Sequence, residues 1–376
     1  MEPMNQSAPP GPGWADGRPQ MEYSERMAYE TAVREAKRQL RKTANRNARM
    51  ILLFLVGSTL AVRGLYWLLS NVFHWGTQAE QSWATLMAYV LMYLICAPLV
   101  ILLWNRLKPK QKMRYYFQKP AQNMSFLLRW SVIGIGMTYA ASFINNFFFT
   151  MLQSIFHMQF QAPALITGID LPQLFIVLFI VPFAGPLMEE LLFRGSMLGR
   201  TAQFGEWFAI FAMAVSFGLY HQNYEQIFFA AVFGLILGFV TIKSRSIWPA
   251  LIMHVVINLA GGLQEIFVKL IGNLEGVAEA YQNGTFRPEQ LRQIYQSAPA
   301  IGTMLFISLS CLTLAIIGIV LLVREIRTNR HVFKLQNPCP ILTGSQKFCT
   351  YLSAPWTIVG LVLTLSVTVL RIFGVV

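Results

Sequence analysis

Nine apolar segments, each close to the length needed to cross a bilayer, constrain this chain more than any other feature. A helix requires about 20 residues, at about 1.5 Å per residue, to cross about 30 Å of hydrocarbon. The segments lie near residues 51–73, 83–104, 126–151, 173–199, 206–223, 226–242, 248–272, 300–323 and 354–374. Only 12% of the 376 residues are charged, whereas soluble domains carry about 25%. We therefore predict an all-α fold, a polytopic transmembrane helical bundle.

The loop charges predict the orientation of the chain. Fourteen of the 30 Lys and Arg residues lie in short segments that follow the second, fourth, sixth and eighth apolar segments, while the loops 74–82 and 157–172 contain none. Cytoplasmic loops carry such an excess of basic residues, so we expect a cytoplasmic N-terminus and an external C-terminus. The net charge of +13 then favours anionic lipid headgroups over nucleic acid as a partner.

Composition divides the chain into three parts. Residues 1–49 comprise a Pro- and Gly-rich start, expected to be disordered, and a basic, helix-favouring stretch from residue 22 with one weak apolar stripe. We expect this stretch to form a juxtamembrane helix along the cytoplasmic headgroups, with a solvated helix as the alternative. Residues 50–325 form the transmembrane core, and residues 326–376 a basic cytoplasmic loop and the ninth span.

Three ionisable residues lie within six positions of one another near the end of the fourth segment. An unpaired charge at mid-bilayer costs at least ~2.5 kcal/mol, so such residues are candidates for a functional site. Residues four apart on a helix are neighbours, so Glu190 and Arg194 can pair, while Glu189 points about 100° away. We expect Glu189 to be a free carboxylate that accepts a proton. The alternative is a helix end with charges that reach the interface.

A histidine of the fifth segment can meet Glu189. If the fourth and fifth segments form a hairpin that turns near residues 202–205, Glu189 and His221 both lie roughly 22 to 25 Å from the turn. They then share the same depth on adjacent helices. Phe217 lies one turn before His221 and should pack beside it.

The seventh segment supplies a second polar pair. His254 and Asn258 are four residues apart, so they share one face of an otherwise apolar helix. Their depth, about 13 to 20 Å from the boundary at Arg245, overlaps that of Glu189. A single buried histidine is usually a satisfied core residue. Two histidines, an asparagine and a glutamate on three helices indicate a site.

These residue types suit amide hydrolysis through a tetrahedral intermediate. A glutamate beside a histidine can activate water, and an amide with a second imidazole can donate hydrogen bonds to the developing oxyanion. The sequence contains no GxSxG, and no cysteine adjoins a histidine, so a covalent nucleophile has no support. HExxH is also absent. Glu189, His221 and His254 could nevertheless hold a catalytic zinc with one open position.

Three motifs carry a family resemblance. They are EELLFR at residues 189–194, FGLYH at 217–221 and HVVIN at 254–258. They resemble the EExxxR, FxxxH and HxxxN or HxxxD signatures of the CPBP (Abi) intramembrane protease family, which includes the type II CAAX prenyl endopeptidases. The resemblance covers roughly residues 80–325. It implies about eight core helices around a cavity open to the cytosol, plus one extra C-terminal span, with Glu190 and Arg194 bracing the site.

The resemblance also implies catalytic roles. Glu189 would act with His221 to activate water, and His254 and Asn258 would stabilise the oxyanion. The family has been discussed both as metalloproteases and as metal-independent glutamate proteases. We favour no cofactor, because asparagine is a poor zinc ligand, and keep zinc as the alternative.

We therefore predict an intramembrane endopeptidase that hydrolyses a peptide bond of a membrane-associated protein or peptide. The general character of the sequence indicates a multi-pass protein of a bacterial plasma membrane. The substrate does not transfer from the family, whose eukaryotic members trim prenylated C-termini and whose bacterial relatives are linked to peptide maturation and bacteriocin immunity. The alternative is a non-catalytic immunity factor, scaffold or transporter that uses the same residues as a polar packing network.

Overall fold

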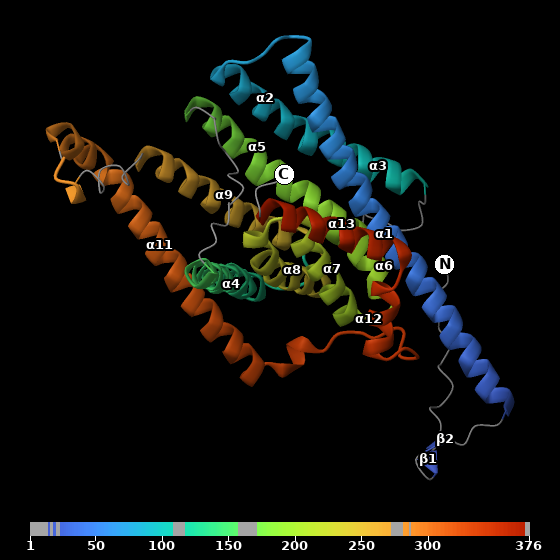
Figure 1. Ribbon diagram of the computed structural model, residues 1–376. Helices are drawn as coiled ribbons and strands as arrows, with labels where there is room; N and C mark the ends of the chain where they lie inside the picture. The colour runs from blue at the N-terminus through green and yellow to red at the C-terminus, as the bar shows by residue number, and fades with distance from the viewer. Residues whose placement is uncertain are drawn as a thin grey trace.

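The computed structural model describes residues 14–15, 18–19, 23–107, 117–156, 171–271, 281–285 and 287–372. Its helices are α1 (Tyr23–Asn71), α2 (Gln78–Val90), η1 (Leu91–Cys96), α3 (Ala97–Leu107), α4 (Met124–Phe156), α5 (Leu171–Glu190), η3 (Leu191–Leu198), α6 (Gly199–Ala202), α7 (Glu206–Tyr220), α8 (Tyr224–Ser244), α9 (Trp248–Ile271), α11 (Pro288–Thr328), η4 (Arg330–Phe333), α12 (Gly344–Leu352) and α13 (Pro355–Ile372). Two short strands, β1 (Trp14–Ala15) and β2 (Arg18–Pro19), pair antiparallel. The predicted helical bundle is confirmed (Figure 1).

Seven helices of the described chain are long and apolar enough to cross a membrane. They are Tyr23–Asn71, Ala79–Trp104, Met124–Phe156, Tyr224–Ser244, Trp248–Val268, Pro288–Thr328 and Pro355–Ile372. The described parts of all nine predicted apolar segments lie mainly in helices, but seven helices rather than nine are long and apolar enough to cross a membrane. Helix α7 has only 15 residues, which cover about 22 Å at about 1.5 Å per residue.

Helix α1 runs through the expected boundary between residues 49 and 50. The basic stretch and the first apolar segment form one continuous helix of 49 residues, because no Gly or Pro interrupts the boundary between them. Leu40 and Ala44 in the basic stretch are fully buried, so this part packs on protein. Of the start that was expected to be disordered, only β1 and β2 belong to the described residues.

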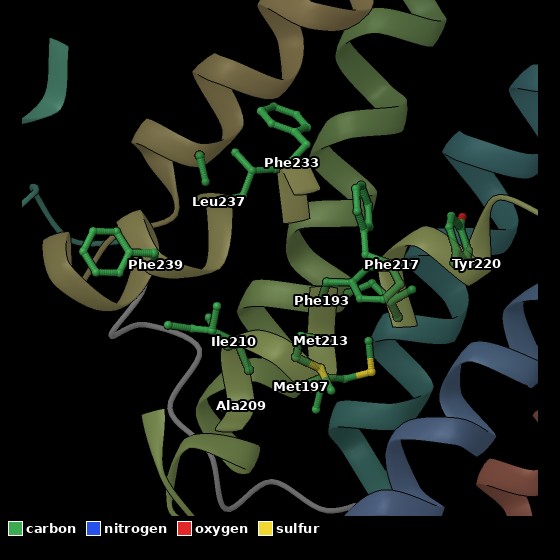
Figure 2. Packing of buried hydrophobic residues seen from close by; sticks show 14 of the residues in the cluster. Phe193, Met197, Ala209, Ile210, Met213, Phe217, Tyr220, Phe233, Leu237 and Phe239 are labelled. Carbon is green, nitrogen blue, oxygen red and sulfur yellow. The ribbon is translucent and has the colours of Figure 1, made fainter. Parts of the chain in front are cut away.

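The hairpin of α7 and α8 lies at the centre of the bundle (Figure 1). Figure 2 shows its apolar core, in which Phe193 and Met197 of η3 meet Ile210 and Phe217 of α7. The rings of Phe193 and Phe217 pack edge to face, with centroids 5.1 Å apart. This packing fixes η3 against α7.

Helices α4 and α11 cross with their backbones in contact. A Cβ atom on Gly136 would lie 2.8 Å from Gly318 Cα and closer still to the carbonyl of Leu314. Small residues allow membrane helices to approach in this way, since association depends on close packing. The glycine pair therefore sets the distance between the two helices.

The described residues of the expected C-terminal part, 326–372, contact α7. Trp207 Nε1 at the start of α7 donates to Phe333 O (2.9 Å), and Gln336 N donates to Glu206 Oε2 (2.7 Å). The loop after α11 thereby covers the start of α7. The loop charges predict that this end of α7 faces the cytoplasm.

Helices α12 and α13 are also bonded to α1. Asn47, which is 1% exposed, donates from Nδ2 to Thr201 Oγ1 (3.0 Å) and to Tyr351 OH (3.2 Å). Asn45 Oδ1 accepts from Trp356 N at 2.9 Å. Helix α1 therefore packs against α6, α12 and α13.

We expect Gly136→Val to destabilise the bundle, because the new side chain cannot fit against α11. Overpacking costs about 1–3 kcal/mol, and the thermal midpoint of the detergent-solubilised protein should fall. Gly302→Val on α11 is the matched control, since nothing lies within 4 Å of a Cβ at that position. Equal midpoints for the two variants would contradict the backbone contact.

Candidate active site

A change of helix type marks the segment that carries the glutamates. The α-helical hydrogen bonding of α5 ends at Glu190, and Leu191–Leu198 form a π-helix. The sequence predicted one continuous helix over 173–199. Pro182 and Pro186 lie inside α5 and remove two backbone donors just before this point. Such π-helical turns occur frequently at functional sites.

Glu190 and Arg194 form the ion pair expected from their spacing. Arg194 Nη1 lies 2.9 Å from Glu190 Oε1, and the two side chains are 1% and 0% exposed. Arg194 Nη2 also donates to Gly234 O at 3.3 Å, and its guanidinium carbon lies 4.6 Å from the centre of the Phe217 ring. The pair therefore ties η3 to α7 and α8.

His254 bridges both glutamates. Its Nδ1 lies 2.9 Å from Glu190 Oε1, and its Nε2 lies 3.6 Å from Glu189 Oε2. The imidazole is 3% exposed and packs edge to face on Phe217 and Phe233, with centroids 5.6 Å away in each case. The structure thus brings the histidine of α9 directly to the carboxylates, whereas sequence spacing assigned His221 as the partner of Glu189.

His221 also packs against Phe217. Its Nδ1 is 2.8 Å from Phe217 O, and its ring centroid is 4.9 Å from that of Phe217. A carbonyl only accepts hydrogen bonds, so Nδ1 carries the proton and Nε2 of the neutral ring is an acceptor. Asn258 is half-buried on α9, one turn after His254, and makes no hydrogen bond with the described residues.

Glu189 borders a small recess, with about 10 Å³ of space for the centre of a water-sized molecule. The recess is lined by Phe54, Tyr93, Ala97, Ile101, Met188, Glu189, Leu192 and Tyr220. The carboxylate is 7% exposed, and its Oε2 is buried without a hydrogen-bond partner. Most buried polar atoms are hydrogen-bonded, so an exception beside a recess indicates a place for a water or substrate atom.

Sequence reasoning missed the walls of this recess. Tyr93 of η1 packs on Gly185, where a Cβ would lie 3.3 Å from the ring. Gly185 stands one turn before Glu189, which is the sequence signal that could have indicated a close approach. Tyr220 adjoins His221 and reaches the same recess.

Arg371 of α13 contacts the turn that carries His221. Its Nη1 donates to Gln222 O at 3.3 Å, and Gln222 has φ of 51°. A non-glycine residue in this region costs about 1–3 kcal/mol and persists where its surroundings hold it. Asn223 Oδ1 caps α8 by accepting from Glu225 N at 3.0 Å. The α7–α8 turn is therefore fixed by contacts from α13 as well as by its own cap.

The candidate zinc ligands do not form a metal site. Within the part of the chain that the structure describes, no group of three or more His, Cys, Asp or Glu residues could hold a metal ion. Nδ1 of His254 is engaged by Glu190 and Nδ1 of His221 by a carbonyl. Metal-bound histidines make the same kind of contact through their second ring nitrogen, so zinc is kept as the alternative to a metal-free mechanism.

The segment that carries the candidate site residues matches a known protein family. Residues 171–260 match the family model described as type II CAAX prenyl endopeptidase Rce1-like. This segment is Rce1-like. All three motifs lie within it, although the match is narrower than the expected range of 80–325. No curated protein and no solved structure matches the chain.

The Rce1-like match supports a CAAX-type intramembrane protease at the level of the family. Together with the seven apolar helices, it identifies the chain as an integral membrane protein. The Rce1-like segment runs from the start of α5 to the middle of α9. Helices α1, η1 and α3, which line the recess, and α13, which contacts the α7–α8 turn, lie outside it.

We expect Arg194→Ala and Glu190→Ala to reduce the amount of folded protein strongly. Each leaves one buried charge without its partner, which costs about 3–5 kcal/mol. Glu189→Gln should leave the amount unchanged, since Glu189 has no part in the ion pair. Detergent-solubilised protein measured by size-exclusion chromatography checks this, and normal accumulation of both alanine variants would rule out the bracing role.

We expect Arg371→Gln to loosen the α7–α8 turn. Loss of a hydrogen bond from a charged donor costs about 1.5 kcal/mol or more, which corresponds to roughly tenfold faster amide exchange around Gln222. Hydrogen exchange with mass spectrometry measures this. Arg324→Gln, an exposed arginine at the end of α11, is the control. Unchanged exchange around Gln222 would show that α13 does not hold the turn.

Proposed function

We propose that this protein is an intramembrane endopeptidase that hydrolyses a peptide bond of a membrane-associated protein or peptide. The single observation that carries the proposal is the environment of Glu189. Its buried Oε2 has no hydrogen-bond partner, lies 3.6 Å from His254 Nε2 and borders a recess among six helical elements. A carboxylate so placed can accept a proton from a water molecule in the recess.

Glu189 and His221 are the candidates for activating water. A water that gives a proton to Glu189 becomes a hydroxide, which attacks the carbonyl carbon of the peptide bond. His221 presents Nε2 as an acceptor, because its Nδ1 donates to Phe217 O, and can orient the same water. The proton taken by Glu189 then passes to the nitrogen of the leaving amine, so the carboxylate is regenerated.

His254 and Asn258 are the candidates for stabilising the tetrahedral intermediate. In its imidazolium form His254 donates from Nδ1 to Glu190 and from Nε2 toward the substrate oxygen. Glu190, held by Arg194, fixes the orientation of the ring. The Asn258 amide has no partner among the described residues, so it is free to donate a second hydrogen bond.

The bilayer position of this site suits a substrate that is itself held at the membrane. The recess is bounded by apolar and aromatic side chains, with Glu189 as its one carboxylate. We place the enzyme in a bacterial plasma membrane with its N-terminus in the cytoplasm, on the basis of the loop charges and the general character of the sequence.

A non-catalytic role is the competing candidate, and one observation favours it. Arg194, Glu190 and His254 form a buried set of hydrogen bonds that would serve packing alone. Glu189 distinguishes the two functions, because a packing network gains nothing from a second buried carboxylate that borders a recess.

We expect Glu189→Gln to abolish peptide processing while the protein accumulates normally. General acid–base catalysis contributes about 10²–10⁴-fold, so product peptides should fall at least about a hundredfold. Comparative proteomics of membrane peptides from cells with the wild-type protein and with the variant measures this and identifies the substrate. Glu265→Gln, an exposed glutamate on α9, is the control. Identical peptide profiles for wild type and Glu189→Gln would refute the protease proposal.

A further inference from the structure

A second group of polar residues lies away from the glutamates, where α1, α3 and α6 meet. Arg46 of α1 stacks over Trp104 of α3, with its guanidinium carbon 5.6 Å from the ring centre. Arg200 of α6 lies close enough for Arg46 to act on it electrostatically. Arg46 is therefore near both Trp104 and Arg200, and the two cations come from elements far apart in the sequence.

Two donors in this group are buried and lack an acceptor. Trp104 Nε1 and Arg200 Nη1 both have no hydrogen-bond partner. A buried donor without an acceptor costs about 1–3 kcal/mol, and more when it is charged. Trp104 and Arg200 therefore provide two hydrogen-bond donors near Arg46 that lack an acceptor.

The charge of Arg200 also indicates that an anion is missing. Burial and the nearby Arg46 lower the pKa of Arg200 to about 10, so it is still protonated at neutral pH. No carboxylate acts on its guanidinium in the described chain. A buried guanidinium without a carboxylate partner is stabilised when an anion binds to it.

The position of the group identifies the class of anion. Arg49, one turn further along α1, stacks on Trp356 at 5.9 Å, so two arginine–tryptophan pairs lie at one level of the bundle. Tryptophan is enriched at the level of the lipid headgroups. Phosphate groups of phospholipids occupy that level, and planar guanidinium groups bind phosphate through paired hydrogen bonds.

We propose that Arg46, Trp104 and Arg200 form a binding site for the phosphate of an anionic phospholipid. The site extends the expectation of headgroup contacts along α1 to a defined location on α1, α3 and α6. Arg46 and Arg200 supply the charge, and Trp104 supplies a neutral donor that fixes the orientation of the phosphate. The inference does not depend on the proposed protease activity.

Native mass spectrometry of the full-length protein, purified from membranes in a mild detergent, tests the site. Wild type should retain a phospholipid, and Arg200→Gln should retain at least about tenfold less, because a charge-assisted hydrogen bond is lost. Trp104→Phe keeps the ring beneath Arg46 and removes only the N–H donor, so it should also weaken retention. Arg41→Gln, an exposed basic residue on the same helix, should retain lipid as wild type does.

A second arm distinguishes the sources of phosphate. Delipidated protein is mixed with phosphatidylglycerol, with phosphatidylcholine or with inorganic phosphate, and its thermal midpoint is measured. We expect the largest rise with phosphatidylglycerol and none with Arg200→Gln. An equal rise with inorganic phosphate would replace the lipid by a free phosphate ligand. Wild-type retention by both Arg200→Gln and Trp104→Phe would overturn the site, and Trp104→Phe decides alone if Arg200→Gln does not fold.

Discussion

The carboxylate of Glu190 is the group on which the rest of the site depends. It is fully buried and accepts hydrogen bonds from both Arg194 and His254 at 2.9 Å. A carboxylate in this position is tolerated only where donors surround it. Arg194 brings in the backbone of α8 through Gly234, and His254 brings in α9. One buried charge thereby holds three helical elements at a fixed separation.

Glu189, the neighbouring residue, has the opposite environment. Its side chain leaves the helix in a different direction, toward the recess, and its Oε2 remains without a partner. Two adjacent carboxylates thus have different surroundings. Glu190 Oε1 accepts from two donors while its Oε2 has no partner, whereas Glu189 borders the recess and is available for proton transfer. Phe217 packs edge to face against the imidazoles of both His221 and His254, so it restricts the orientation of both rings.

Much of what holds this arrangement lies outside the Rce1-like segment. Phe54 and Tyr93 close the recess from α1 and η1, and Arg371 contacts the turn after His221. Asn47 joins α1 to α6 and α12 through two donors. Helices α1, α12 and α13 therefore pack around the segment that carries the motifs.

The sequence by itself determined the features that depend on local spacing. Apolar length predicted the helices, the four-residue interval predicted the pairing of Glu190 with Arg194, and the motifs predicted which helices would meet. Only the tertiary structure decided which partner each polar atom takes. The bond from His254 to Glu190 joins residues 64 apart, and that from Arg371 to Gln222 joins residues 149 apart. Helical periodicity fixes the face on which a side chain lies, but it carries no information about the rotation and depth of one helix against another, and these depend on packing.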